Sequence, residues 1–218
     1  FDLVGVLVDT AEWHYQAWQK IADQAGLPFS RKHNEAFRGV SRMDCVARLV
    51  AGASRRYTPA EQVDLAARKN ACYLHLIAQL NPADLAPGAR QLCSNLRAAH
   101  ARLAIVSASR NARTVIDRLG IADWFDVLID GNHTTASKPD PEGFLLAARH
   151  LGTPPARCVI IEDAEAGLQA ARAAGMAAVA IAPPGSPLEA LADAAAPEVG
   201  ALSADQILAL AARSAART

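Results

Sequence analysis

From residue 88 onward, short apolar runs alternate with amphipathic stretches, a pattern typical of strands that are each followed by a helix. A glycine often follows an amphipathic stretch and marks the end of a helix. The pattern predicts helices over 89–100, 115–119, 140–151 (with Asp140 as the N-cap) and 164–174, and strands over 103–106, 127–129, 158–161 and 178–181. This alternation indicates an α/β fold built on a doubly wound, Rossmann-like parallel sheet.

The segment from about residue 10 to residue 81 is different, because it is nearly all helical and contains no strand-like run. One apolar helix face extends from Ala17 to Ala25, and a capping box at Thr58 begins a long helix towards Leu80. The simplest interpretation is a helical module inserted just after the first strand. We therefore expect an α/β core of residues 1–9 and 82–218 and a helical cap domain of residues 10–81, with hinges near Asp9–Thr10 and Asn81–Pro82.

The bulk composition excludes several classes of protein. Lys plus Arg and Asp plus Glu both number 22, so the sequence lacks the broad positive charge of a nucleic-acid-binding protein. No apolar run approaches the ~18 residues that cross a bilayer. The four cysteines are scattered without CxxC spacing, which favours reduced thiols and a cytoplasmic protein. The sequence starts at Phe1 without a methionine, so we expect the first strand to begin before it.

Charged and hydroxyl side chains stand at the ends of the predicted strands. Asp2 follows the first strand and Ser107 the second, while Lys138 lies in a later loop and Glu162 and Asp163 follow the strand over 158–161. Parallel strands bring such positions to one edge of the sheet. Carboxylates crowded there repel one another unless a cation intervenes, and Mg²⁺ prefers their oxygen ligands. Asp2 would then attack a phosphoryl group whose charge Mg²⁺ and Lys138 neutralise, with Ser107 donating a hydrogen bond to it.

Each of these residues also has a structural explanation. A single aspartate after a strand is commonly a turn or capping residue, and Ser107 or the Glu162–Asp163 pair could cap the following helix. Lys138 could be an exposed loop charge. Taken together, in this order and each at a strand end, the residues are hard to attribute to capping alone.

The order of these motifs resembles that of the haloacid dehalogenase superfamily. The segments that carry the resemblance are 1–10 (FDLVGVLVDT), 107–109 (SAS), 137–139 (SKP) and 161–163 (IED). Other segments are similar to the β-phosphoglucomutase family within it, namely 9–18 (DTAEWHYQAW), 38–42 (RGVSR), 68–70 (RKN) and 107–111 (SASRN). The match extends over essentially the whole chain. The first four motifs specify only the superfamily, whereas the segments of the insert are more specific.

The resemblance implies a role for each matching residue. Asp2 would be the nucleophile that becomes phosphorylated, and the residues binding the transferring phosphoryl group would be Ser107, Ala108 and Lys138. The implied ligands of Mg²⁺ are Asp2, Glu162, Asp163 and the backbone carbonyl of Val4. Arg42 would bind the second phosphate of a hexose phosphate substrate, with help from Ser109 and Asn111. The remaining implied substrate, catalytic or hinge positions are Thr10, His14, Trp18, Gly39, Val40 and Lys69, of which Trp18 is also explained by packing.

Val4 departs from the family pattern. Phosphatases and mutases of the superfamily carry a second aspartate two residues after the nucleophile, where it moves protons to and from the sugar hydroxyl. Valine cannot do so, and the loss of a positioned acid–base group costs typically ~10²–10⁴-fold in rate. The leading hypothesis is therefore an impaired, monomeric β-phosphoglucomutase-like enzyme. It would interconvert β-glucose 1-phosphate and glucose 6-phosphate through an aspartyl-phosphate and a glucose bisphosphate.

Other functions within the superfamily remain open. They are a sugar-phosphate phosphatase, a dehalogenase, a phosphonate hydrolase that uses Lys69 or Lys32 for a Schiff base, and a non-catalytic sugar-phosphate binder. The Glu162–Asp163 pair and Arg42 argue against a dehalogenase, because a haloacid needs neither a metal nor a phosphate site. The segments of the insert argue against a phosphonate hydrolase.

Overall fold

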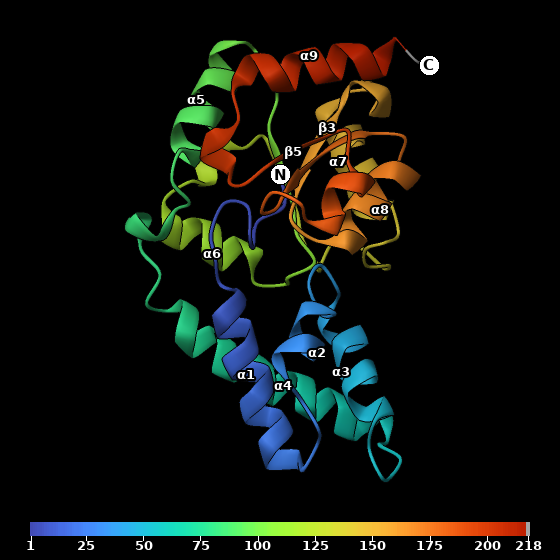
Figure 1. Cartoon of the computed structure of the whole chain (residues 1–218). Coiled ribbons are helices and arrows are strands. Elements are labelled where there is room, and N and C mark those ends of the chain that lie inside the picture. The colour runs from blue at the N-terminus through green and yellow to red at the C-terminus, as the bar shows by residue number, and fades with distance from the viewer. Residues whose placement is uncertain (217–218) are drawn as a thin grey trace.

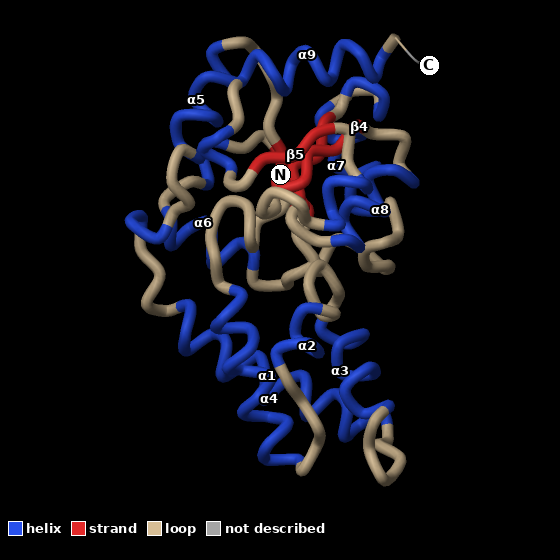
Figure 2. Tube along the Cα trace, in the orientation of Figure 1, coloured by secondary structure: helices blue, strands red, loops and turns tan. Residues whose placement is uncertain are grey.

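The computed structural model describes residues 1–216, with a parallel sheet and its helices at one end and the helices of residues 11–77 at the other (Figure 1). The strands are β1 (Ala104–Val106), β2 (Val127–Ile129), β3 (Val159–Glu162), β4 (Ala177–Ile181) and β5 (Ala194–Ala196). β1 pairs with β2, and β4 pairs with both β3 and β5, in each case in parallel (Figure 2). The predicted α/β fold with a doubly wound parallel sheet is confirmed.

The first two residues join the two parts of this sheet. The Phe1 amino group donates to the carbonyl oxygen of Ala104 at 2.8 Å, and the Phe1 carbonyl oxygen accepts from the N–H of Val106 at 2.9 Å. On the other side, the N–H of Asp2 donates to the carbonyl oxygen of Ile161 at 2.9 Å. Phe1 and Asp2 therefore lie between β1 and β3. The Asp2 carboxylate is thereby placed at the carboxyl edge of the sheet.

Helices cover both faces of the sheet, and the strand residues alternate between two hydrophobic clusters as a period of two requires. Ile105, Ile161 and Val179 belong to a cluster with residues of α5 (Ala89–Ala98), α6 (Ala112–Leu119) and α9 (Ala204–Ala215). Val106, Ile160 and Ala178 belong to a cluster with residues of α7 (Glu142–Leu151) and α8 (Glu165–Ala173). The 3₁₀ turns are η1 (Pro82–Asp84), η2 (Ala122–Trp124), η3 (Pro155–Arg157), η4 (Pro187–Leu191) and η5 (Val199–Ala201).

Four helices follow the first turn of the chain: α1 (Ala11–Ala25), α2 (Arg31–Glu35), α3 (Arg42–Ala51) and α4 (Pro59–Ile77). Their contacts form a hydrophobic cluster of their own around Trp18, Val46 and Leu65. The predicted capping box is present, because Thr58 Oγ1 accepts from the N–H of Glu61 and the Glu61 carboxylate accepts from the N–H of Thr58. This segment is all helical, as its sequence pattern predicts.

Several predicted boundaries need correction. β3 includes Glu162, which therefore lies in the strand rather than after it. α7 begins at Glu142 with Pro141 at the N-cap, although Asp140 Oδ1 still accepts from the N–H of Glu142 at 2.9 Å. β5 was not predicted, because its three alanines favour helices by propensity and become a strand only by pairing with β4.

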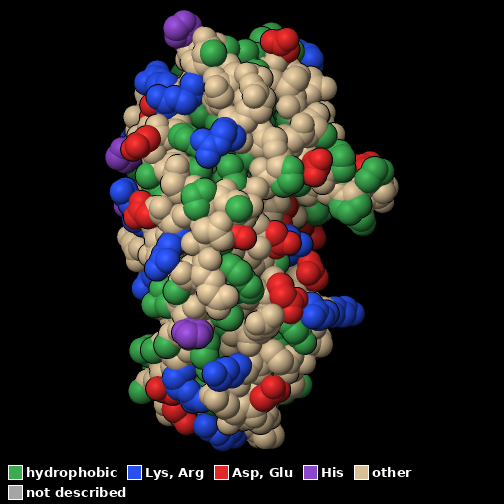
Figure 3. Space-filling model, turned by 90° about the vertical axis from the view of Figure 1, so that its left-hand side faces the viewer, with side chains coloured by type: hydrophobic (Ala, Val, Ile, Leu, Met, Phe, Trp, Pro, Cys, Tyr) green, Lys and Arg blue, Asp and Glu red, His purple; other side chains and the backbone are tan. Residues whose placement is uncertain are grey.

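The charged side chains of the surface are mixed in sign. On the face shown in Figure 3, acidic and basic side chains are intermixed rather than gathered by sign. Within residues 1–216, no helix combines the length and the apolar character that a membrane span requires.

Candidate active site

Three carboxylates meet at the carboxyl edge of the sheet. One oxygen from each of Asp2, Glu162 and Asp163 lies within 4.8 Å of the others, and all three residues are buried. Asp2 and Glu162 are placed by neighbouring strand positions, while Asp163 begins the loop towards α8. Carboxylate oxygens at this spacing suit a hard divalent cation, which needs neither thiolate nor imidazole ligands. The residues present therefore fit a magnesium-type site.

The Lys138 ammonium holds two of these carboxylates together. Its Nζ donates to Asp2 Oδ1 at 2.6 Å and to Glu162 Oε1 at 2.5 Å. Burial by itself would lower the pKa of Lys138, but the two carboxylates outweigh it and raise that pKa. Burial raises the pKa of Asp2 to about 6, although Lys138 acts in the opposite direction. Lys138 is thus a permanent cation, placed to counter negative charge beside Asp2.

Glu162 is fixed at the N-terminus of α8. Its Oε2 accepts from the N–H of Asp163 at 2.6 Å and from the N–H of Ala164 at 3.0 Å. Burial opposes ionisation, but Lys138 and these two N–H groups lower the pKa of Glu162. A Cβ on Gly167 would lie 1.7 Å from Glu162 Oε1, so only glycine leaves room for this carboxylate. The glutamate therefore stays ionised in a position that packing defines.

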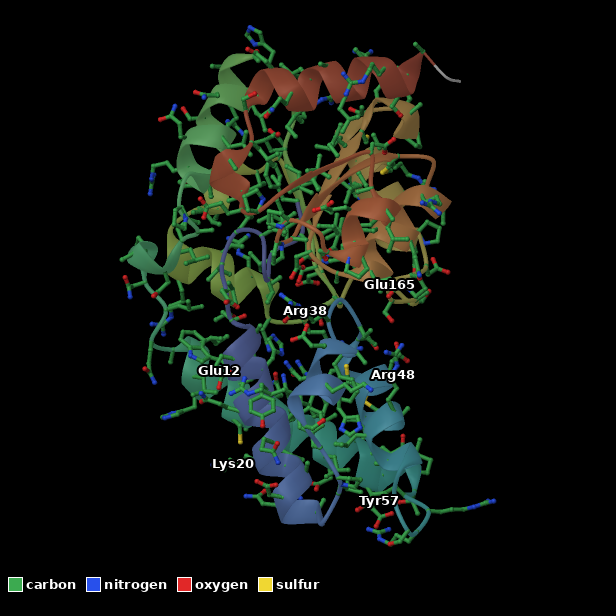
Figure 4. The ribbon with its side chains drawn as sticks, in the orientation of Figure 1. Glu12, Lys20, Arg38, Arg48, Tyr57 and Glu165 are labelled. Atoms are coloured by element: carbon green, nitrogen blue, oxygen red, sulfur yellow. The ribbon has the colours of Figure 1, made fainter. Side chains whose placement is uncertain are left out.

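Asp163 carries a different partner, the guanidinium of Arg38. Arg38 Nη2 donates to Asp163 Oδ2 at 2.5 Å and Arg38 Nη1 donates to Glu35 Oε2 at 3.2 Å. Arg38 comes from the segment between α2 and α3 and points towards the sheet, as Figure 4 shows. Burial and then repulsion by Glu162 and Asp2 raise the pKa of Asp163, and Arg38 opposes this shift. Sequence reasoning gave Arg38 no role, although Arg38 opens the segment 38–42 that carried the resemblance.

A cavity lies between this edge of the sheet and helices α1, α3 and α4. Most of the predicted site residues line it: Asp2, Val4, His14, Trp18, Gly39, Val40, Arg42, Lys69, Ser107, Ala108, Ser109, Asn111 and Asp163. Arg38 and Arg110 line it as well, and neither was predicted. Thr10, Lys138 and Glu162 do not line the cavity, although Lys138 donates to both Asp2 and Glu162. Thr10 is fully buried at the N-cap of α1, where its Oγ1 lies 3.1 Å from the Tyr73 hydroxyl oxygen.

The turn after β1 supplies hydrogen-bond donors to the cavity. Ser107 Oγ accepts from the N–H of Ser109 at 3.2 Å, and Ser109 Oγ accepts from the N–H of Asn111 at 3.2 Å. These bonds hold the backbone of the turn before α6 begins. Within residues 1–216, the N–H of Ala108 donates to no protein acceptor. The turn can therefore offer this N–H group and the Ser107 hydroxyl to an anion.

The opposite wall of the cavity is basic. Arg42 is the first residue of α3, after the N-cap Ser41, and burial followed by repulsion from Arg110 lowers its pKa. Gly39 has a φ of +71°, which glycine adopts without strain, and the turn it makes precedes Arg42. A guanidinium at a helix N-terminus is not favoured by the helix dipole. The helix dipole therefore does not explain the position of Arg42, which lines the cavity.

His14 and Lys69 form a buried pair on the same wall. Lys69 Nζ lies 2.8 Å from His14 Nδ1, and 4.5 Å and 5.1 Å from the ring centroids of Tyr73 and Trp18. Burial, then repulsion by Arg42, lowers the pKa of Lys69 to about 7. Burial, then repulsion by Lys69 and Arg42, lowers the pKa of His14 well below its usual value. Both groups can therefore be neutral near pH 7.

Val4 faces the cavity at the position where an acid–base carboxylate was expected. It is half-buried, and its neighbour Gly5 has a φ of +90° with its Cα close to Asp163. The valine side chain offers no oxygen to a sugar hydroxyl or to Lys69. The cavity thus combines the Asp2 carboxylate with the guanidinium groups of Arg38, Arg42 and Arg110, and position 4 contributes no carboxylate.

Comparisons with known proteins identify the family and the relatives of this chain. Residues 1–175 match the model of the haloacid dehalogenase-like hydrolases. The chain is 44% identical over 183 residues to β-phosphoglucomutase of Bacillus subtilis, covering 83% of this chain and 81% of that protein. It is 29% identical to fructose-1-phosphate phosphatase of Escherichia coli, covering 82% and 93%. The structure of β-phosphoglucomutase from Clostridium difficile is similar with a TM-score of 0.92 at 33% identity, covering 98% and 96%.

Proposed function

The chain belongs to the haloacid dehalogenase-like hydrolase family, and from that premise we propose that it is a phosphoryl-transfer enzyme of the β-phosphoglucomutase type. The proposed reaction interconverts β-glucose 1-phosphate and glucose 6-phosphate through phosphorylated Asp2 and a glucose bisphosphate. The observation that carries this proposal is that Asp2 and Arg42 line one cavity. A carboxylate nucleophile and a guanidinium in one cavity suit a hexose that carries a phosphate at each end.

The residues around Asp2 have separate tasks in this reaction. One Asp2 carboxylate oxygen forms a bond to phosphorus as the bond from phosphorus to the sugar oxygen breaks, and that sugar oxygen gains a proton. In the reverse step the oxygen of the other sugar hydroxyl bonds to phosphorus and loses its proton as the bond from phosphorus to Asp2 breaks, so one proton is taken up and one is released in each cycle. Lys138, which donates to Asp2 at 2.6 Å, offsets the negative charge of the phosphoryl oxygens. The Ser107 hydroxyl and the Ala108 N–H donate to those oxygens. Arg42, with Ser109 and Asn111, holds the second phosphate.

The donor set at the sheet edge fits Mg²⁺. Asp2, Glu162 and Asp163 would hold it through carboxylate oxygens, and the Val4 backbone carbonyl would be a fourth ligand. When bound, the ion supplies positive charge that offsets repulsion between the carboxylates and a phosphate. Glu162 is already fixed by two N–H groups, so it is the ligand that needs least rearrangement.

We further propose that residues 10–81 act as a cap that closes the cavity over the substrate. Polar contacts join the two sides at its rim: Ser137 Oγ donates to Asp44 Oδ2 at 2.7 Å, and Asn111 Nδ2 donates to Asn70 Oδ1 at 2.8 Å. Closure excludes water, so phosphorylated Asp2 returns its phosphoryl group to sugar rather than to solvent. The proposed protein is a cytoplasmic monomer, and its four unpaired cysteines agree with a reducing compartment.

Val4 supports a second candidate function, a sugar-phosphate-binding protein with little or no turnover. The cavity would keep its anion-binding residues, while no carboxylate beside Asp2 would move protons at the sugar hydroxyl. The two candidates differ in whether an acid–base group at position 4 restores turnover.

A single pair of variants tests the proposed function. Val4→Asp and Val4→Asn are compared with the unaltered chain for conversion of β-glucose 1-phosphate to glucose 6-phosphate, with Mg²⁺ and a glucose bisphosphate primer. Val4→Asp should raise the rate ~10²–10⁴-fold, whereas Val4→Asn, which has a similar shape but no acid–base group, should not. Binding of the sugar phosphate by calorimetry with no turnover in either variant would favour the binding protein and refute the mutase.

A further inference from the structure

Arg38 carries a charge from the insert (residues 10–81) to the carboxylate cluster of the core. Its Nη2 donates to Asp163 Oδ2 at 2.5 Å, and its Nη1 donates to Glu35 Oε2 at the end of α2. Within residues 1–216, the pair of Arg38 and Asp163 is the only ion pair between the insert and the core. In Figure 4, Arg38 lies where the two parts of the molecule meet. The single charged contact between them therefore ends on a proposed metal ligand.

The insert is packed closely against the core at this contact. Gly39 has a φ of +71°, and a Cβ on it would lie 3.6 Å from both Ala164 Cβ and Lys138 Cδ. Arg38 and Asp163 line two hollows, the cavity of the active site and a groove between α2 and α8. Their ion pair is therefore part of the wall that separates the cavity from the groove.

Asp163 is a poor common partner for Arg38 and a divalent cation. The Asp163 side chain is 6% exposed, and one of its oxygens lies within 4.8 Å of oxygens of Asp2 and Glu162. A cation held by this cluster and the Arg38 guanidinium are like charges beside one buried carboxylate, so each disfavours the other. Arg38 already contacts Glu35, so a guanidinium released from Asp163 keeps a carboxylate partner within the insert.

We propose that Arg38 is a positioning residue that couples closure of the insert to the metal site: Arg38 and a divalent cation compete for Asp163, so binding of the cation releases the charged contact between insert and core. This proposal rests on the metal site of the proposed function but not on the reaction. The neutral contact of Asn70 with Asn111 does not involve the carboxylate cluster and remains. Release of Arg38 alone therefore loosens the insert beside the groove.

Calorimetric titration of the full chain with Mg²⁺ at pH 8 measures this coupling. Coupling between two interactions is reciprocal, so if the cation weakens the contact of Arg38, then Arg38 weakens binding of the cation by the same factor. Arg38→Gln should therefore bind Mg²⁺ at least ~5-fold more tightly than the unaltered chain. Arg38→Lys keeps a cation and should bind Mg²⁺ with an affinity closer to that of the unaltered chain.

Two further variants are controls for the titration. Arg31→Gln removes the same charge from the surface, where Arg31 pairs with Glu12 and not with a proposed metal ligand. Asn70→Ala removes a neutral contact between insert and core. Neither variant should change the affinity for Mg²⁺.

Amide hydrogen exchange of residues 35–41 measures the insert itself. In the unaltered chain, exchange should be at least ~3-fold faster with Mg²⁺ than in EDTA, because the contact with Asp163 is released. In Arg38→Gln it should be equally fast under both conditions. Equal or weaker Mg²⁺ binding by Arg38→Gln overturns the proposal and leaves the proposed function in place, and so does exchange in the unaltered chain that Mg²⁺ slows or leaves unchanged. Absence of Mg²⁺ binding in every variant overturns both this proposal and the metal site of the proposed function.

Discussion

Lys138 Nζ lies between Asp2 and Glu162, at 2.6 Å and 2.5 Å from their carboxylate oxygens, and all three side chains are buried. One ammonium thus compensates two carboxylates that would otherwise repel each other across the sheet edge. Removing one member of a buried ionic group is costly, because the remaining charges lose their partner in a medium of low polarity.

Lys138→Met should therefore lower the free energy of unfolding by about 3–5 kcal/mol at pH 8 in EDTA. Urea unfolding followed by circular dichroism measures this change. The triple variant Lys138→Met, Asp2→Asn, Glu162→Gln should recover much of the loss, since no buried charge then lacks a partner. A single variant as stable as the unaltered chain would show that this ionic group contributes little to folding.

Lys69 gives a prediction for the pH dependence of stability. Its folded pKa is lowered to about 7 from the ordinary 10.5, so between these values the unfolded chain binds more protons. Stability must then rise with pH over that window, by up to ~1.4 kcal/mol per pH unit from this group. When the free energy of unfolding is plotted against pH, the slope between pH 8 and pH 10 should be smaller in Lys69→Met by that amount. Urea unfolding at several pH values measures it.

The exposed Lys20 supplies the control for this effect. Lys20→Met should leave the slope between pH 8 and pH 10 unchanged, because an exposed lysine has a similar environment in the folded and unfolded chain. Equal slopes in Lys69→Met and the unaltered chain would mean that burial does not lower the pKa of Lys69.

The sequence predicted the elements of the fold whose signals are local. Alternating strands and helices placed Asp2, Ser107 and Glu162 at one sheet edge, and the capping box at Thr58 fixed the start of α4. β5 could not be predicted in this way, because three alanines carry no pattern and form a strand only beside β4. The formation of β5 therefore depends on a contact between segments rather than on a local pattern.

Most candidate site residues were named from motifs, but contacts between distant segments were missed. Arg38 and Asp163 are 125 positions apart, and although Arg38 lies in the segment 38–42, nothing in that segment indicates that its partner is Asp163. The burial of Lys69 likewise follows from the packing of α1 on α4, which brings His14 to it. Charge pairing between distant segments requires the folded structure.

Gly5 should tolerate no side chain, for two separate reasons. Its φ of +90° is unfavourable for other residues, and an added Cβ would lie 1.9 Å from Asp163 Oδ2. Gly5→Ala should therefore destabilise the protein and also displace Asp163 from the carboxylate cluster. Calorimetric titration with Mg²⁺ should show binding weakened at least ~10-fold.

A variant at Gly26 distinguishes the backbone penalty from the displacement of Asp163. It has a φ of +65° but no atom within 4 Å of an added Cβ, so Gly26→Ala should cost only the backbone penalty of ~1–2 kcal/mol and leave Mg²⁺ binding intact. If both variants bind Mg²⁺ as the unaltered chain does, displacement of Asp163 has no effect on the metal site.

Arg38 should stabilise the protein mainly when no metal neutralises Asp163. Arg38→Gln leaves the Asp163 carboxylate without its charged partner, and the free energy of unfolding in EDTA should fall by about 1–3 kcal/mol. With saturating Mg²⁺ the loss should be smaller, because a bound divalent cation compensates the same carboxylate. Urea unfolding with EDTA and with Mg²⁺ measures both values.

Arg31 is the matched control, since it also pairs with a carboxylate but at the surface. The side chains of Arg31 and Glu12 are 69% and 48% exposed, whereas those of Arg38 and Asp163 are 33% and 6% exposed. Arg31→Gln should therefore change stability by less than ~1 kcal/mol, and equally with and without Mg²⁺. If the free energy of unfolding of Arg38→Gln falls by the same amount in EDTA and in Mg²⁺, Arg38 and the metal ion do not compensate the same carboxylate. A loss that Mg²⁺ reduces would place Arg38 and the cation in competition for Asp163.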